Sequence, residues 1–148
     1  MRCVDVNVLV YAHRPESPDH RVYLAWLESA RTGAEPLGLI AQVASGFLRI
    51  VTHARIFREP TPLSVALEFL DVLWASPSVT AVTPGERHWP LFRAACADVG
   101  ATGNRVPDAF LAAVAMEHNA TWVSADRGFA RFPNLRWQHP LDPGGASR

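Results

Sequence analysis

Residues 104–129, NRVPDAFLAAVAMEHNATWVSADRGF, decide the fold that this sequence predicts. Eight apolar residues, 109–116, follow Asp108 without a break, and a helix that is apolar on every side is a buried one. Pro107 suits the first turn of this helix, and Asn119 suits the position just after its end. The stretch therefore predicts a buried helix with a carboxylate at its start.

A second carboxylate follows the next predicted strand. Residues 121–124, Thr-Trp-Val-Ser, predict a short buried strand, and 126–128, Asp-Arg-Gly, signal a turn. Each acid has an ordinary explanation: Asp108 as an acid favoured by the helix dipole, Asp126 as a turn residue. A third acid in a matching place favours a shared site over these separate explanations. The reason is that burying an unpaired carboxylate costs roughly several kcal/mol.

The N-terminus supplies that third acid. Residues 2–5 begin a predicted strand whose alternation reaches Asp5 and Asn7 before the apolar run 8–10. Asp5 is thus expected at the end of a buried first strand.

Length and composition indicate one domain, expected over residues 1–139, with a flexible tail over 140–148. No apolar run approaches about 20 residues and no signal-peptide pattern opens the chain, so no membrane association is expected. Cys3 and Cys96 are expected to be core residues in a reducing cytoplasm.

The formal net charge is zero, so no global field attracts nucleic acid. All 14 basic residues are nevertheless Arg, and the chain has no Lys. A GC-rich genome is the favoured explanation. Because the planar guanidinium binds phosphate bidentately, any nucleic-acid surface here must be a local arginine patch.

Strands and helices alternate along the rest of the chain. The patterns predict helices over residues 17–33, 40–53, 61–74 and 84–99, a polar glycine loop over 101–106, and strands over 36–39, 79–82 and 132–137. In the second of these helices Gly46 is unusual, since glycine costs about 1 kcal/mol there relative to alanine. No internal repeat is visible.

This alternation predicts a three-layer α/β/α fold with a mainly parallel sheet. Such sheets carry their sites at the carboxyl ends of the strands. If the first and late strands are neighbours, Asp5, Asp108 and Asp126 converge in one crevice.

Three converging carboxylates need a cation, because like charges otherwise raise one another's pKa. Oxygen ligands select Mg²⁺ or Mn²⁺, and no His or Cys stands at zinc-site spacing near them. A hydrated Mg²⁺ suits phosphoryl chemistry, and the absence of a glycine-rich phosphate loop argues against a nucleoside triphosphate. A phosphodiester is the substrate class that remains.

Three segments resemble the PIN-domain ribonucleases, and specifically the VapC toxins of toxin–antitoxin pairs: VDVNVLVYA, FLRIVTHARIF and PDAFLAAVAMEHNATWVSADRGFARFPNLRW. The resemblance covers residues 3–137. It implies a parallel five-stranded sheet flanked by helices, Mg²⁺-dependent endoribonuclease activity, a cognate VapB-type antitoxin and a homodimer. It also implies that an antitoxin segment lies in an apolar groove near helices 17–31 and 42–53.

The resemblance also assigns site residues. The family's metal-binding acids match Asp5, Asp108 and Asp126, and its supporting polar residues match Asn7 and Ser124.

Two positions depart from the family pattern. Gly46 stands where a Glu is usual, and Gly128 where many relatives have a second acid. One hydrated Mg²⁺ on Asp5 and Asp108, with Asp126 bound directly or through water, is therefore expected. Alternatively, Gly46 simply lets a helix or the substrate backbone approach closely.

The working hypothesis is an endoribonuclease in which metal-activated water leaves a 5′-phosphate and a 3′-hydroxyl. Candidates to hold RNA phosphates are Arg49, Arg55, Arg105 and Arg127. The alternative is a catalytically weak PIN-fold protein that binds RNA or antitoxin. A receiver-like phosphoacceptor ranks low, because it would need a Lys.

Overall fold

The computed structural model describes residues 1–142 of the chain, so residues 143–148 of the expected tail lie outside the described part. Its strands form one five-stranded sheet in the order β3-β2-β1-β4-β5, and every neighbouring pair is parallel. The predicted parallel five-stranded sheet is confirmed. The strands are β1 (Arg2–Val4), β2 (Leu37–Ile40), β3 (Val79–Val82), β4 (Thr121–Val123) and β5 (Trp137–Gln138).

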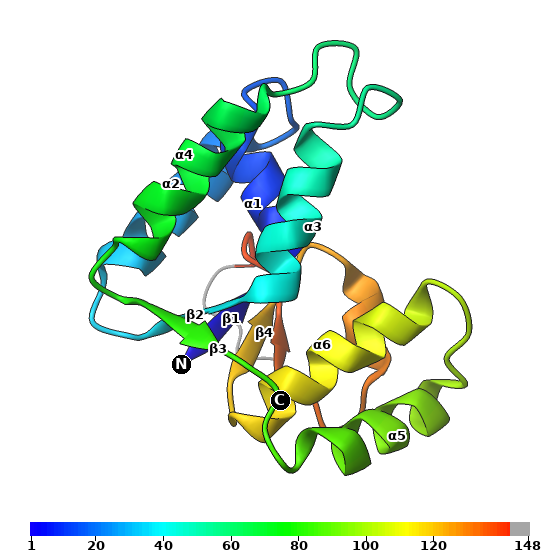
Figure 1. Ribbon diagram of the computed structural model, residues 1–148. Helices are drawn as coiled ribbons and strands as arrows, with labels where there is room; N and C mark the ends of the chain where they lie inside the picture. The colour runs from blue at the N-terminus through cyan, green and yellow to red at the C-terminus, as the bar shows by residue number, and fades with distance from the viewer. Residues whose placement is uncertain (143–148) are drawn as a thin grey trace.

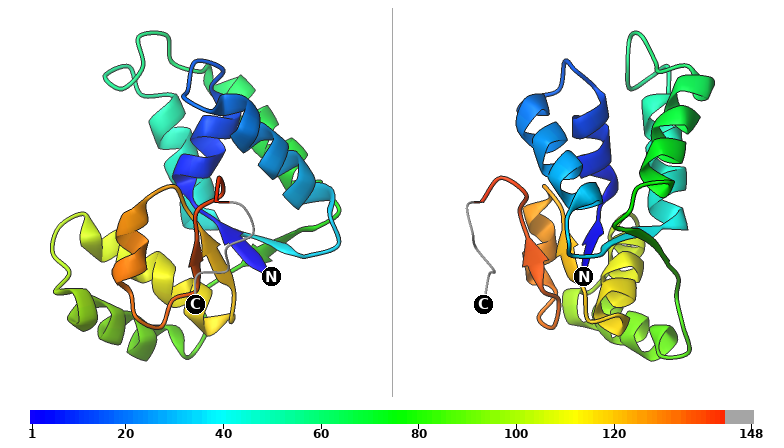
Figure 2. Two further views of the ribbon diagram at one scale, coloured as in Figure 1. Left: turned by 180° about the vertical axis from the view of Figure 1, so that it is seen from behind. Right: turned by 90° about the vertical axis from the view of Figure 1, so that its left-hand side faces the viewer.

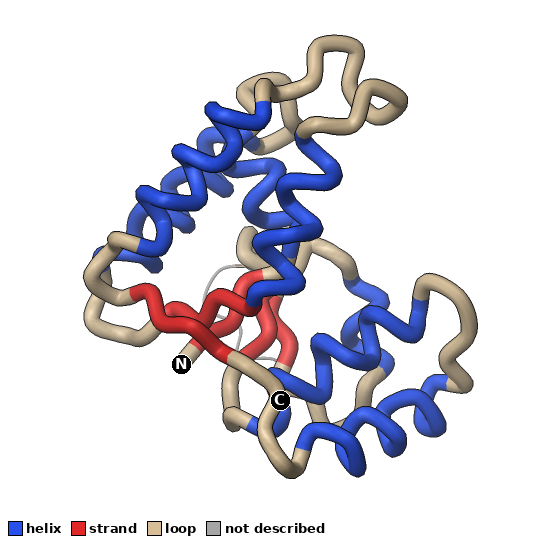
Figure 3. The backbone as a smooth tube through the Cα atoms, in the orientation of Figure 1, coloured by secondary structure: helices blue, strands red, loops and turns tan. Residues whose placement is uncertain are grey.

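Helices cover both sides of this sheet and pack in two groups. In Figures 1 and 2, α1–α4 lie together on one side of the strands and α5 and α6 lie on the other. Figure 3 shows the red sheet between the two groups of blue helices. The helices are α1 (Val6–His13), α2 (His20–Thr32), α3 (Ala41–Val51), α4 (Leu63–Trp74), α5 (His88–Val99) and α6 (Arg105–Glu117), with a 3₁₀ helix η1 (Arg127–Arg131) before β5.

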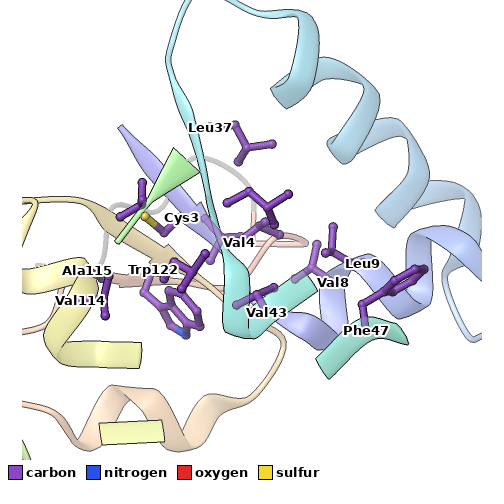
Figure 4. Packing of buried hydrophobic residues seen from close by; sticks show 14 of the residues in the cluster. Cys3, Val4, Val8, Leu9, Leu37, Val43, Phe47, Val114, Ala115 and Trp122 are labelled. Carbon is purple, nitrogen blue, oxygen red and sulfur yellow. The ribbon is translucent and has the colours of Figure 1, made fainter. Parts of the chain in front are cut away.

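The core contains the apolar runs that the sequence singles out. Figure 4 shows Trp122 of β4 near Val114 and Ala115 of α6, with Val43 of α3 and Val8 of α1 close by. All five side chains are fully buried. Among the residues that the structure describes, no helix is both long and apolar enough to cross a bilayer.

The strand order places a functional edge at β1 and β4. These two strands are neighbours, and the chain leaves β1 toward β2 on one side, whereas β4 and β5 lie on the other. The crevice outside the carboxyl ends of strands at such a reversal is the usual site of ligands in parallel sheets. Asp5 and Ser124 each follow directly after one of these two strands.

The first strand ends before Asn7, which the alternation of the predicted strand reaches, whereas Asp5 stands at the end of the strand as expected. β1 ends at Val4, and residues 6–13 form α1, in which Val8, Leu9 and Val10 are buried. The β-branched run favours a strand, but Asp5 accepts a hydrogen bond from the Val6 amide and caps a helix there. Tertiary burial decides the outcome.

Smaller corrections concern where elements begin and end. The predicted strand 132–137 is displaced, since β5 is Trp137–Gln138 and residues 127–131 form η1. α5 begins at His88 and not at Pro84. α6 begins at Arg105, inside the loop predicted over 101–106.

Candidate metal-binding active site

Asp5 joins β1 to α1. Its backbone amide donates to the Val123 carbonyl at 2.9 Å, which continues the pairing with β4. Its carboxylate Oδ1 accepts from the amide of Val6 at 2.7 Å and so caps α1. The carboxylate is therefore held at the sheet edge by both elements, and Asp5 is only 7% exposed.

Ser124 donates its hydroxyl proton to Asp5. The Ser124 Oγ lies 2.5 Å from Asp5 Oδ2, and it accepts from the Asp126 amide at 3.0 Å and from Asn7 Nδ2 at 3.1 Å. A hydroxyl has one proton and two lone pairs. Since both lone pairs are used, the proton is directed at Asp5, and Ser124 supports the ionised form of that carboxyl group.

Asn7 links α1 to the segment after β4. Its Nδ2 donates to Asp5 Oδ2 at 3.2 Å, and its Oδ1 accepts from the Ala125 amide at 3.1 Å. Asp5, Asn7 and Ser124, three of the five predicted site residues, are therefore joined by hydrogen bonds. Asn7 and Ser124 thus both donate to the same oxygen of the Asp5 carboxylate, Oδ2.

The other two acids come from α6 and from the turn after β4. Asp108 lies in the first turn of α6, where its Oδ2 is 3.8 Å from Arg105 Nη1. Asp126 is exposed, and its Oδ1 accepts from the Gly128 amide at 2.7 Å, which caps η1. Asp5, Asp108 and Asp126 all line one open cavity of about 1340 Å³.

The three acids influence one another electrostatically. Burial raises the pKa of Asp5 to about 6; the hydrogen bonds from Ser124 and Val6 lower it, and the charges of Asp108 and Asp126 raise it further. Burial also raises the pKa of Asp108, Asp126 adds to this, and the Arg105 guanidinium opposes it. The acids are thus close enough to repel one another.

This donor set fits a hard, hydrated divalent cation. All three side chains offer carboxylate oxygens, which Mg²⁺ and Mn²⁺ prefer. Within residues 1–142, no three acidic, His or Cys side chains are gathered closely enough to hold an ion by themselves. A Mg²⁺ ion would need only some of its ligands from the protein, because it usually keeps several waters.

Apolar side chains form most of the remaining cavity wall. They come from α1, α3, the loop after α3, α5, α6 and η1, and none comes from α2. Of the two helices next to which the antitoxin groove is expected, α3 borders this cavity and α2 does not. The apolar residues are Val6, Val10, Tyr11, Ala41, Ile50, Ile56, Phe57, Phe92, Val106, Pro107, Phe110, Leu111 and Phe129.

The candidate arginines are not equivalent. Arg49 lines the large cavity, and Arg105 lies beside Asp108. Arg55 and Arg127 line neither this cavity nor the smaller one next to it. Arg127 instead lies 3.4 Å from Asp142.

The two unusual glycines each accept a neighbouring side chain. A Cβ built at Gly46 would lie 2.9 Å from Val6 Cγ2, so the missing side chain lets α1 and α3 approach closely. A Cβ at Gly128 would lie 2.6 Å from Arg105 Nη1. In this chain a valine and a guanidinium group therefore lie against positions 46 and 128.

Comparison with known proteins identifies the family of this chain. Residues 2–135 match the PIN domain family. The chain belongs to the PIN-domain family. Within it the VapC ribonucleases are similar: "VapC ribonuclease Mb2897" of Mycobacterium bovis and "Ribonuclease VapC43" of Mycobacterium tuberculosis are each 55% identical over 142 residues, 96% of this chain and 97% of theirs. The chain is thus a VapC-type PIN-domain protein.

A solved structure shares the PIN fold. The "Crystal structure of VapBC2 from Rickettsia felis bound to a DNA fragment from their promoter" contains a chain that aligns with a TM-score of 0.68 at 19% identity, covering 93% of this chain and 96% of that one. At this identity the likeness shows the fold alone.

Proposed function

We propose that this PIN-domain protein is a Mg²⁺-dependent endoribonuclease toxin that a cognate VapB-type antitoxin neutralises. The observation that carries the proposal is the convergence of Asp5, Asp108 and Asp126 on one cavity at the β1/β4 edge. The chain's 55% identity to VapC ribonucleases supports it, as does the general dependence of that family on a divalent metal.

Asp5 and Asp108 would hold the cation, with Asp126 bound to it directly or through water. A Mg²⁺ ion there would neutralise charge on the phosphate and make water a better nucleophile. Mn²⁺ has the same preference for oxygen ligands.

The residues around the acids orient the reacting groups. Ser124 and Asn7 keep the Asp5 carboxylate fixed through their hydrogen bonds. Asp126 orients the attacking water and accepts its proton, while Arg49 on the cavity wall holds a phosphate. The water oxygen bonds to phosphorus as the bond to the 3′-oxygen breaks, so the products carry a 5′-phosphate and a 3′-hydroxyl.

The test is cleavage of total RNA by the purified protein with Mg²⁺ or with EDTA. The wild type is expected to cut only with Mg²⁺, and Asp5→Asn and Asp108→Asn are each expected to lose about 100-fold or more in rate. Mapping the 5′-phosphate ends would identify the RNA that is cut. Binding without scission would instead support the weak RNA- or antitoxin-binding protein.

The antitoxin is expected to cover the apolar wall of the cavity. Phe57, Phe92 and Phe110 lie there, which suits the apolar face of a partner segment. Adding the antitoxin should abolish cleavage. We also propose that the protein forms a homodimer and acts in the cytoplasm. Light scattering of the purified protein tests the dimer.

A further inference from the structure

A second, smaller cavity lies directly beside the metal-binding site. It has a volume of about 520 Å³, and its wall is shared with the large cavity at Asn104, Asp108 and Asp126. Arg105 of α6 and Arg131 at the end of η1 also line it. In Figures 1 and 2 the orange segment of η1 lies beside α6, the helix that carries Arg105.

The two cavities differ in chemistry. The large one is mostly apolar on the side away from the acids, whereas the small one combines two guanidinium groups with Thr102 and Asn104. Arg131 is exposed, and no hydrogen bond or ion pair found among residues 1–142 involves its side chain. A guanidinium group that lines a cavity without an acid of its own is available for an anionic ligand.

Gly128 determines where the Arg105 guanidinium lies. Arg105 Nη1 occupies the space that a side chain at position 128 would take, since a Cβ built there would lie 2.6 Å away. From that place it is 3.8 Å from Asp108 Oδ2 and faces the small cavity. The absence of a side chain at Gly128 thus brings a positive charge next to the proposed catalytic carboxylates.

We propose that Arg105 and Arg131 form a subsite for an RNA phosphate next to the one that is cut, and that Gly128 keeps Arg105 in this subsite. This inference rests on the proposed function. The small cavity shares the Asp108–Asp126 wall with the reaction site, so an RNA strand crossing that wall brings a neighbouring phosphate to the two arginines.

Asp108 and Asp126 also face the subsite, and their charges offset those of the two arginines. A divalent cation on the acids leaves the cavity with a net positive charge, which attracts an RNA phosphate. Without the cation the four side chains sum to zero, and removing either arginine makes the cavity negative. Loss of an arginine therefore weakens RNA binding with or without Mg²⁺.

The experiment compares Arg131→Gln, Arg105→Gln and Gly128→Ala with the wild type. Arg93→Gln is the matched control, because Arg93 is exposed and lines neither cavity. Binding of a short fluorescent single-stranded RNA of mixed sequence is measured by anisotropy in EDTA over a range of salt. KM and kcat for RNA cleavage are measured with Mg²⁺.

Each arginine variant is expected to bind RNA about threefold to tenfold more weakly, with a salt slope smaller by about 0.7. KM should rise by a similar factor, and this rise should be larger than any fall in kcat. Gly128→Ala should also weaken RNA binding in EDTA although it removes no charge, because the added Cβ would lie 2.6 Å from Arg105 Nη1 and would displace it. The same Cβ would lie 2.9 Å from Asp126 Oδ1, so this variant is compared by RNA binding and not by kcat. Arg93→Gln should behave as wild type.

Wild-type binding, salt slope and KM in both arginine variants would overturn the subsite while leaving the Mg²⁺-dependent nuclease intact. If these variants lose affinity for the antitoxin only, the cavity serves that partner and the proposal is equally wrong. A wild type that never cuts RNA would refute the proposed function, whereas the EDTA binding series would still test the subsite. Thermal unfolding of every variant confirms that each is folded.

Discussion

Asp5 is a buried acid whose neighbours act on its charge in opposite directions. Burial and the two other carboxylates raise its pKa, and Ser124 and the Val6 amide lower it. Its pKa of about 6 in the folded protein lies above the value of about 3.9 expected in the unfolded chain. The folded state therefore binds this proton more tightly, and ionisation of Asp5 costs stability in the absence of a cation.

The pH dependence of unfolding tests this cost. As pH rises from about 4.5 to about 7.5 in EDTA, the wild type should lose roughly 2 kcal/mol of unfolding free energy relative to Asp5→Asn. The loss is expected because the folded state holds the Asp5 proton more tightly than the unfolded chain does. Urea denaturation of both proteins at several pH values gives the difference. A difference that does not change with pH would show that Asp5 ionises as easily in the folded protein as in the unfolded chain.

Ser124 supports three groups at once. Replacing it by alanine removes the donor to Asp5 and leaves Asn7 Nδ2 and the Asp126 amide without their shared acceptor. Because these groups lie at least partly buried, we expect a loss of about 1–3 kcal/mol in unfolding free energy. Mg²⁺ affinity, measured by calorimetry, should also fall.

Ser124→Thr is the matched control, since it keeps the hydroxyl. It should keep Mg²⁺ affinity, with some loss of stability from a methyl group added at a fully buried position. Equal Mg²⁺ affinity in the alanine and threonine variants would contradict the role given to the hydroxyl.

Among the elements, the contact between α1 and α3 depends on Gly46. Alanine would gain about 1 kcal/mol in helix propensity, but its Cβ would meet Val6 Cγ2 at 2.9 Å, and such overpacking costs about 1–3 kcal/mol. The steric cost is the larger. Gly46→Ala should therefore destabilise the protein by about 1 kcal/mol in chemical denaturation.

A double-mutant cycle separates the two effects. In a Val6→Ala background the added Cβ has room, so Gly46→Ala should be neutral or stabilising there, with a coupling of about 1 kcal/mol. Additive effects would show that the close approach of Val6 is not what position 46 requires. The same contact explains why an acid at position 46 would not fit without a change at Val6.

Helix α1 shows where element prediction from the sequence fails. Residues 8–10 are Val-Leu-Val, a pattern shared by buried strands and buried helices. Asp5 decides between them by capping α1, and its role as a cap depends on its place at the end of β1. An acid at the capping position, followed by Val6, Asn7 and then the apolar run, was the available local signal.

For the whole molecule, a bound cation should couple the sheet edge to α6. Asp5 follows β1, Asp126 follows β4 and Asp108 belongs to α6, so an ion shared by them stabilises the folded state only. At a Mg²⁺ concentration about 100 times its Kd, stability should rise by about 2.7 kcal/mol. Differential scanning fluorimetry with Mg²⁺ or EDTA measures the rise in Tm.

Asp108→Asn should lose most of that rise, and Arg93→Gln should keep it. An unchanged Tm in the wild type over the whole Mg²⁺ range would contradict a shared ion site.

The sequence alone determined the α/β class, the parallel sheet and the three acids, because the alternation of apolar segments and the acids at their ends are local patterns. It did not determine that α1 starts at Val6, that β5 is confined to Trp137–Gln138, or that α2 stays away from the cavity. Only the tertiary structure placed Val6 against Gly46 and Arg105 against Gly128. The sequence shows that a glycine has no side chain, but only the packing of distant segments decides which neighbouring side chain occupies the space beside it.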